Sequence, residues 1–160
     1  MKRIRILHGP NVRLIGRGRE PELYRSRPWD EVWKTLQEKY STQALLSFFE
    51  SPHEGQLISW IWEVEAYDGL IFNPGALAHT SYALYDALRG AGKPCIEVHV
   101  SQIYARERFR HRLITAAACR GVIIGLGEYG YEMALLALLY GDSNATDIGS
   151  PSSSVLKNPK

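Results

Sequence analysis

Short aliphatic runs alternate along this chain with longer segments in which apolar residues recur every three or four positions. Strands that alternate with helices in this way are typical of a parallel sheet, because right-handed crossovers place the helices on both of its faces. The runs that we predict to be strands are residues 3–7, 43–49, 69–72, 95–100 and 122–125. The alternation therefore predicts an α/β protein with three layers, a sheet between two layers of helices.

Four helices are predicted from apolar residues spaced like the turns of a helix. They are residues 28–40, 52–65, 80–89 and 129–140. The sequence Ser51-Pro52-His53-Glu54 predicts a capping box for the second helix, with Pro52 at its first position. Gly90 and Gly92 predict the end of the third helix. Residues 101–119 are predicted to form a loop with a short helix.

The length and composition set the number of domains. A chain of 160 residues with 45% hydrophobic and 22% charged content has room for one domain and little for a second. We predict that this domain spans residues 1–141, with a disordered tail over residues 142–160, which are rich in Ser, Asn, Gly and Pro. At this length the flavodoxin-like strand order 2-1-3-4-5 is the leading candidate.

The charge and the cysteines exclude several classes of protein. Nineteen Lys and Arg against seventeen Asp and Glu give a formal net charge of +2, which argues against a dedicated surface for nucleic acid or membranes. The apolar runs are too short for a signal peptide or a membrane span. We expect a soluble, cytoplasmic protein in which Cys95 and Cys119, which lack the spacing of a metal or redox motif, are buried thiols.

Polar clusters follow three of the predicted strands. Residues 8–11, 73–76 and 97–101 stand at the ends of the first, third and fourth strands, which would be neighbours in the predicted order. Ligands of such sheets bind beyond the carboxyl ends of the strands, where the strand order reverses. The clusters therefore predict one ligand cleft, although Asn73-Pro74-Gly75 taken alone is also ordinary turn chemistry.

Glu97, His99 and Ser101 are spaced by two residues, which places them on the same face of a strand. A carboxylate beside an imidazole raises the proton affinity of the ring and sets its orientation, as a general acid requires. His99 is therefore a candidate acid. The alternative is a structural pair in the core, in which Glu97 only satisfies the histidine.

A polar loop of residues 12–27 separates the first strand from the first helix and is long for this class of fold. It carries five arginines, with Gly16 and Gly18 as candidate hinges and Tyr24 among the cations. Flexible arginines favour an anionic ligand and also favour the phenolate form of a nearby tyrosine. The loop is thus predicted to be a lid that carries a base, the alternative being a solvated loop anchored by Tyr24.

Three further arginines, Arg106, Arg108 and Arg110, follow the fourth strand and lie either in an exposed turn or against the ligand. The sequence has no Gly-x-Gly-x-x-Gly after the first strand, no Walker loop and no plausible metal triad. We therefore expect a site for a small anionic substrate that works without a cofactor.

Together these motifs resemble those of type II 3-dehydroquinate dehydratase, over about residues 3–140. The segments that carry the resemblance are Gly9-Pro10-Asn11, Arg19-Glu20-Pro21 with Tyr24, Glu54-Gly55, Asn73-Pro74-Gly75-Ala76, His79-Thr80-Ser81, Asp86, Glu97-Val98-His99, Ala105-Arg106-Glu107 and Phe109-Arg110-His111. The resemblance implies a flavodoxin-like fold, a dodecamer built from trimers, and cofactor-free dehydration of 3-dehydroquinate to 3-dehydroshikimate. That reaction would belong to the shikimate pathway or to quinate catabolism.

The resemblance also implies which residues carry the reaction. Tyr24 would remove the proton next to the substrate ketone, and Arg19 and Arg106 would hold it as phenolate. Asn11, through a bound water, would stabilise the enolate that forms.

A second group of implied roles concerns the leaving group and substrate binding. His99, oriented by Glu97, would protonate the departing hydroxyl. The residues implied to bind the substrate are Asn73, Gly75, Ala76, His79, Asp86 from a neighbouring subunit, Val100, Ser101 and Arg110.

The sequence departs from the family pattern mainly in the lid. The stretch from Asn11 to Arg19 is one residue longer, Arg25 stands where Gly is usual, and His8 stands where Asn is usual. Two other functions remain open at this stage: the unrelated type I mechanism, which needs a Schiff-base lysine, and a non-catalytic or slow paralogue that binds a cyclic hydroxy-acid.

Overall fold

A computed structural model describes residues 1–141, so the predicted tail of residues 142–160 lies outside the described residues. Five parallel strands form one sheet in the order β2-β1-β3-β4-β5. The strands are β1 (Lys2–His8), β2 (Ala44–Glu50), β3 (Gly69–Asn73), β4 (Cys95–His99) and β5 (Gly121–Ile124). The predicted strand order is confirmed.

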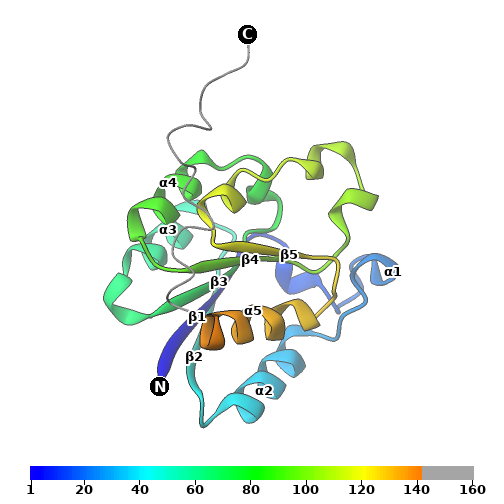
Figure 1. The fold of residues 1–160 in the computed structure, drawn as a ribbon. Coiled ribbons are helices and arrows are strands. Elements are labelled where there is room, and N and C mark those ends of the chain that lie inside the picture. Colours follow the sequence, from blue (N-terminus) through cyan, green and yellow to red (C-terminus); the bar gives the residue numbers. More distant parts are fainter. Residues whose placement is uncertain (142–160) are drawn as a thin grey trace.

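Helices cover both faces of this sheet, as Figure 1 shows. They are α1 (Pro21–Tyr24), α2 (Trp29–Tyr40), α3 (Glu54–Trp62), α4 (Tyr82–Ala91) and α5 (Tyr129–Tyr140). Helices α2 and α5 lie on one face, and α3 and α4 lie on the other. Between β4 and β5 the chain forms three short 3₁₀ turns, Ile103–Ala105, Arg108–His111 and Thr115–Ala118, in place of the predicted short helix.

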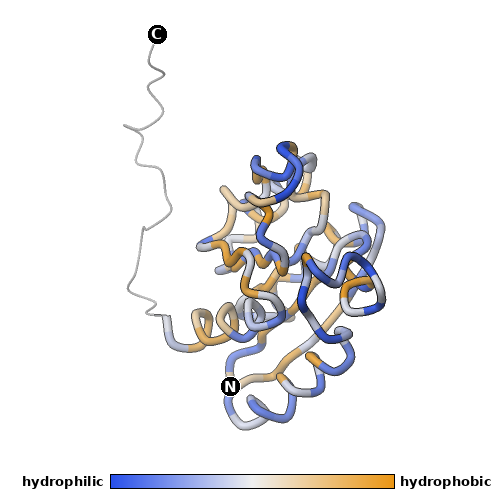
Figure 2. Tube along the Cα trace, turned by 90° about the vertical axis from the view of Figure 1, so that its right-hand side faces the viewer, coloured by the Kyte–Doolittle hydropathy of each residue, from blue (hydrophilic) through white to orange (hydrophobic). Residues whose placement is uncertain are grey.

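The sheet separates two hydrophobic cores, because successive side chains of a strand point to opposite faces. Ile96 and Val98 of β4 belong to the core under α2 and α5, whereas Cys95 belongs to the core under α3 and α4. By the same alternation, Glu97 and His99 share the face of Cys95. Figure 2 shows apolar segments gathered in the interior and hydrophilic loops outside them.

Helices α3 and α4 differ from their predicted bounds at both ends. Helix α3 begins at Glu54, because Ser51 Oγ accepts a hydrogen bond from the backbone N–H of His53 at 3.0 Å and forms a turn there, with no capping box. Gly90 lies within α4, which ends at Gly92, where φ is +62°. A single glycine is tolerated in a helix interior, whereas the left-handed conformation that ends a helix favours glycine.

The two cysteines differ in burial. Cys95 is buried, as predicted, but Cys119 is only half-buried because it lies in the turn that leads into the edge strand β5. Both are free thiols.

The loops that follow β1 and β3 cross at close range. A Cβ atom on Gly9 would lie 2.4 Å from the carbonyl oxygen of Pro74, and one on Gly75 would lie 2.5 Å from the carbonyl oxygen of Pro10. The backbone N–H of Gly9 donates a hydrogen bond to the carbonyl of Asn73 at 2.8 Å. Only glycine allows this approach, which joins the ends of the two central strands.

We expect Gly9→Ala to lower the free energy of unfolding by about 2 to 4 kcal/mol, because the added methyl group must separate two backbone segments. Gly55→Ala is a matched control. Gly55 lies in α3 with open space where the Cβ would stand, so its replacement should be neutral or stabilise by up to about 1 kcal/mol. Urea denaturation compares the two variants, and equal stabilities would show that the crossing relaxes without cost.

Candidate active site

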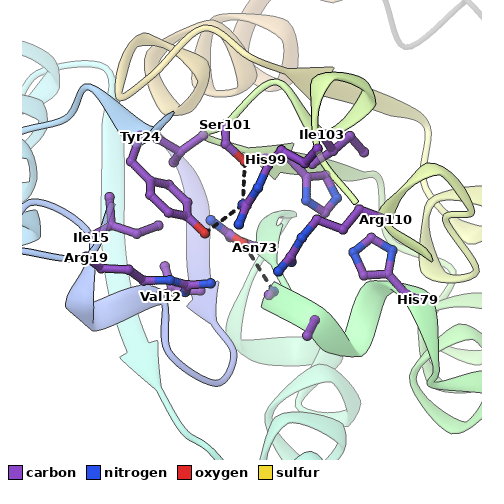
Figure 3. Close-up of a pocket in the computed structure, with 14 residues that line it drawn as sticks. Val12, Ile15, Arg19, Tyr24, Asn73, His79, His99, Ser101, Ile103 and Arg110 are labelled. Carbon is purple, nitrogen blue, oxygen red and sulfur yellow. Dashed lines mark hydrogen bonds between the residues drawn. The ribbon is translucent and has the colours of Figure 1, made fainter. Parts of the chain in front are cut away.

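A small cavity lies where the lid meets the carboxyl ends of β3 and β4 (Figure 3). It is lined by Val12, Ile15, Arg19, Tyr24, Asn73, Gly75, Ala76, His79, His99, Val100, Ser101, Ile103, Arg106 and Arg110. The structure thus brings together all of the predicted site residues except Asn11, Glu97 and Asp86. Val12, Ile15 and Ile103 are apolar wall residues that the sequence analysis did not single out.

Tyr24 closes one side of the cavity from the short helix α1 of the lid. Its ring is 5% exposed, and its hydroxyl accepts a hydrogen bond from Arg106 Nη1 at 2.8 Å. The guanidinium carbon of Arg19 lies 4.9 Å from the centroid of the ring. Two guanidinium groups therefore lie beside the phenol.

Glu20 moderates this positive charge, and the sequence analysis gave it no role. Its Oε2 atom accepts a hydrogen bond from Arg106 Nη2 at 3.3 Å and lies 3.7 Å from Arg19 Nε. Glu107 adds a second carboxylate, since its Oε2 atom lies 3.5 Å from Arg106 Nε, so acidic groups offset much of the positive charge near Tyr24. The adjacent Arg19 and Glu20 were the sequence signal for this cluster.

The backbone of the lid is strained on both sides of Tyr24. Glu20 and Arg25 flank α1 with φ of +35° and +45°, in a region that residues other than glycine rarely adopt. Strain of this kind persists where surrounding contacts compensate for it, and it is common at functional sites. Here the contacts of Arg106 with Tyr24 and Glu20 hold the lid in place.

His99 lies on the scaffold side of the cavity, at the end of β4. Its Nε2 atom is 2.7 Å from Oε1 of Glu97, which is fully buried behind it. The other carboxylate oxygen, Oε2, accepts a hydrogen bond from Thr115 Oγ1 at 2.6 Å. This arrangement leaves Nδ1 as the ring nitrogen available to a ligand. Thr115 was not predicted, because nothing in its sequence context links it to Glu97.

His79 and Arg110 line the side of the cavity opposite Tyr24 and Arg19 (Figure 3). Burial lowers the pKa of His79, and the positive charge of Arg110 adds to this effect. The guanidinium of Arg110 donates a hydrogen bond to Glu107 and holds the pKa of that carboxyl at about 2. This side therefore offers a neutral imidazole and a cation to polar groups of a ligand.

Asn73 lies between these two sides and is held at both ends of its amide. Its Nδ2 atom donates to the hydroxyl of Tyr131 at 2.9 Å, and its Oδ1 atom accepts from the backbone N–H of Gly75 at 3.2 Å. An amide nitrogen carries two hydrogens, so one remains for a ligand.

Three predicted site residues lie outside the cavity lining. Glu97 stands behind His99, in agreement with an orienting role. Asn11 is exposed, with φ of +65°, and its side chain lines a separate surface cavity of about 220 Å³, while its carbonyl oxygen accepts from Arg19 Nη1 at 3.0 Å. Asp86 is exposed on α4. The roles of Asn11 and Asp86 stay predictions.

The lid is closed. The cavity beneath it has a volume of about 30 Å³, which is the share of one water molecule in the liquid. At its far end the lid is bound to α5, since Arg27 donates from both its backbone N–H and its Nε to Glu128 at 2.8 Å. A ligand as large as a six-membered ring therefore requires the lid to move.

Comparisons with known proteins identify the family. The family model for dehydroquinase class II matches residues 2–139. A 3-dehydroquinate dehydratase of Clostridium perfringens is 45% identical over 139 residues, which are 85% of this chain and 96% of that protein. Another, from Anoxybacillus flavithermus, is 47% identical over 141 residues, or 87% and 95% of the two chains. The chain belongs to the class II dehydroquinase family.

The solved structures agree with this membership. The crystal structure of a type II dehydroquinase from Butyrivibrio crossotus matches this dehydroquinase with a TM-score of 0.81 at 36% identity, covering 86% of this chain and 97% of that chain. The predicted family, the flavodoxin-like fold and the assignment as a hydro-lyase are confirmed. Within residues 1–141, no helix is long and apolar enough to cross a membrane. The same residues contain no group of three His, Cys, Asp or Glu side chains placed to hold a metal.

His8 stands beside the active site at the end of β1 and is buried. Its ring packs against Trp29, Phe48 and Tyr131, and neither ring nitrogen has a hydrogen-bond partner within residues 1–141. Burial lowers the pKa of His8 to about 3. The folded protein thus holds this imidazole neutral, whereas the unfolded chain binds a proton below the ordinary pKa of about 6.5.

His8 should therefore lower the free energy of unfolding as the pH falls from about 6.5 towards 3. We expect wild type to lose about 2 kcal/mol more free energy of unfolding than His8→Phe between pH 7 and pH 5, because only wild type carries this linkage. Urea denaturation of both proteins at the two pH values measures the difference. An identical pH dependence would mean that His8 is protonated to the same extent in both states.

Proposed function

We propose that this dehydroquinase dehydrates 3-dehydroquinate to 3-dehydroshikimate without a cofactor, by anti elimination through an enolate. The observation that carries the proposal is the 2.8 Å hydrogen bond from Arg106 Nη1 to the hydroxyl of Tyr24, in the cavity that also holds His99. A proposed base and a proposed acid then line one cavity, which would enlarge when the lid moves. The names of its relatives supply the substrate.

Tyr24 is the proposed base. The substrate ketone makes the hydrogen on the neighbouring carbon acidic, and a phenolate held by Arg106 and Arg19 accepts that proton. Both cations lie within about 5 Å of the phenol ring centroid, at 5.2 and 4.9 Å. When Tyr24 takes the proton, the electron pair of the broken C–H bond moves to the ketone oxygen and forms the enolate.

The enolate needs a hydrogen-bond donor at its oxygen, because that is where charge develops. We propose Asn11, acting through a bound water, for this role. Asn11 lies at the start of the lid, and its carbonyl already accepts from Arg19. Entry of the substrate opens the lid, and the same movement would bring the Asn11 side chain towards the reacting carbons.

His99 is the proposed acid for the second step. The enolate returns its electron pair to form the carbon–carbon double bond, the carbon–oxygen bond to the leaving hydroxyl breaks, and imidazolium supplies the proton that makes water. Glu97 supports this role because its buried carboxylate lies 2.7 Å from Nε2 of His99 and orients the ring. His99 and Tyr24 come from different sides of the cavity, as anti elimination requires.

The remaining polar groups are proposed to bind the substrate. The free amide hydrogen of Asn73 and the backbone N–H groups of Val100 and Ser101 would hold its carboxylate, and His79 and Arg110 its ring hydroxyls. The last group in our proposal is Asp86 of a neighbouring copy, in a dodecamer built from trimers. Apolar side chains exposed on β5, on α5 and in the turn between them support association: Val122, Leu126, Tyr129, Met133, Leu136 and Tyr140.

The setting of the reaction is part of the proposal. We infer a cytoplasmic enzyme of the shikimate pathway or of quinate catabolism, since the composition matches a soluble protein and the reaction serves both routes. The competing function is a slow or non-catalytic paralogue that binds a cyclic hydroxy-acid, which the longer lid and the strained Arg25 would favour.

Replacement of the proposed base and acid tests the mechanism. We expect Tyr24→Phe and His99→Ala each to lower kcat by about 10² to 10⁴, because each removes one proton-transfer group. The conjugated enone of the product absorbs in the ultraviolet and the substrate does not, so absorbance follows the reaction. His53→Ala is a control at an exposed position outside the site and should keep the wild-type rate.

Two results would contradict this mechanism. Near-normal rates in both Tyr24→Phe and His99→Ala would remove their roles, and no rise in absorbance with excess wild-type enzyme would favour the binding paralogue. Borohydride added with substrate distinguishes the type I mechanism from the proposed one, because it traps a Schiff base on lysine. We expect no loss of activity on that treatment.

A further inference from the structure

Thr115 is a fully buried polar residue that touches the active site only through another residue. Its side chain is 0% exposed, and its Oγ1 atom donates to Oε2 of Glu97 at 2.6 Å. Thr115 does not line the cavity. Its hydroxyl is therefore hydrogen-bonded to the carboxylate of Glu97, which in turn contacts His99.

The fold brings these residues together from separate parts of the chain. Thr115 begins the 3₁₀ turn Thr115–Ala118, which packs against α4 on the same face of the sheet as Glu97. The turn is fixed at both ends: Ile114 N–H donates to the carbonyl of Ala78 at 2.7 Å, and Arg120 N–H donates to the carbonyl of Cys95 at 2.7 Å. Thr115 is thus held against β4 by the backbone.

A carboxylate with no exposure is costly unless its oxygens are hydrogen-bonded. For Glu97, Oε1 meets His99 Nε2 and Oε2 meets the hydroxyl of Thr115. A weaker contact adds to Oε2, since Cys119 Sγ lies at 3.9 Å. Thr115 therefore supplies the strong hydrogen bond at Oε2 and restricts the rotation of the Glu97 carboxylate.

We propose that Thr115 is a positioning residue for the general acid: its hydroxyl holds Glu97 as an oriented anion, which fixes His99 with Nε2–H towards Glu97 and Nδ1 towards the substrate. The proposal rests on the proposed role of His99. Without the hydroxyl, Oε2 would lack a strong donor, and Glu97 would rotate or take up a proton. Either change would weaken its hold on the imidazole.

Other charged groups face His99, but their contacts do not reach Glu97. His79 stacks on the imidazole with ring centroids 6.2 Å apart, and the side chains of Arg19, Tyr24, Arg106 and Arg110 line the same cavity. These groups influence the charge of His99 equally in wild type and in variants of Thr115. Comparing variants of Thr115 therefore measures the effect that reaches His99 through Glu97.

The decisive comparison is Thr115→Val against Thr115→Ser. Valine keeps the shape of threonine without its hydroxyl, and serine keeps the hydroxyl. We expect Thr115→Val to lower kcat about 10- to 100-fold with KM within about twofold, as for other residues that orient a catalytic group, and Thr115→Ser to stay within about threefold of wild type. Cys119→Ala removes the weak contact with Glu97, together with the contacts of Sγ with Cys95 Sγ and the carbonyl of Thr115 at 3.5 Å, and keeps the Thr115 hydroxyl, so it should also stay within about threefold.

A spectroscopic signature checks the position of the ring independently of turnover. The proton on Nε2 of His99, held against a buried carboxylate, should give a protected downfield imidazole resonance in the NMR spectrum of the free enzyme. We expect this resonance in wild type, Thr115→Ser and Cys119→Ala, and its loss in Thr115→Val. A purely structural role would lower thermal stability and leave the resonance in the folded fraction.

A double-mutant cycle covers the case in which Thr115→Val does not fold. In a Glu97→Gln background the buried charge is absent, so adding Thr115→Val should change kcat less than twofold. A tenfold further loss there, or a normal kcat and an intact resonance in folded Thr115→Val, would overturn the proposal. If wild type itself did not turn over the substrate, the proposed function would fail, and the NMR comparison alone would decide the role of Thr115.

Discussion

The close crossing of the loops after β1 and β3 is the constraint on which the site depends. Gly9 and Gly75 let each loop pass within van der Waals contact of the other's backbone, at Pro74 and Pro10. The crossing holds Asn73 at the carboxyl end of β3 and fixes the point at which the lid begins. The carboxyl ends of neighbouring parallel strands lie together at such a switch point, so the backbone groups and side chains that follow them are close in space.

The lid and the scaffold divide the chemistry between them. Tyr24 and Glu20 lie on the lid, whereas Arg106 follows β4 and His99 ends it. Arg106 joins the two parts through Tyr24 and Glu20, and it donates also to Ser101 Oγ at 3.1 Å. An arginine fork suits this position because its donors lie in one fixed plane.

Much of this architecture could be predicted from the sequence, because it follows from local periodicity. Helix α5 has its predicted bounds, and the polar residues that follow β3 and β4 meet in one cavity, whereas residues 8–11 after β1 line neighbouring cavities. The contact of Thr115 with Glu97 could not be predicted, since it depends on the path of three 3₁₀ turns, which have no repeating apolar pattern. The placement of Asn11 outside the cavity depends on lid conformation, and a list of motifs carries no information about that.

The closed cavity links activation of the proposed base to exclusion of water. Its volume of about 30 Å³ means that a substrate ring requires the lid to lift, and a lid that lifts with α1 would carry Tyr24 away from Arg106. In such an open state water would solvate the phenol and screen both arginines. Closure over substrate restores the hydrogen bond in a nearly dry space, where the same charges interact more strongly. Tyr24 would therefore become a reactive base only when the substrate, which supplies the proton, is already bound.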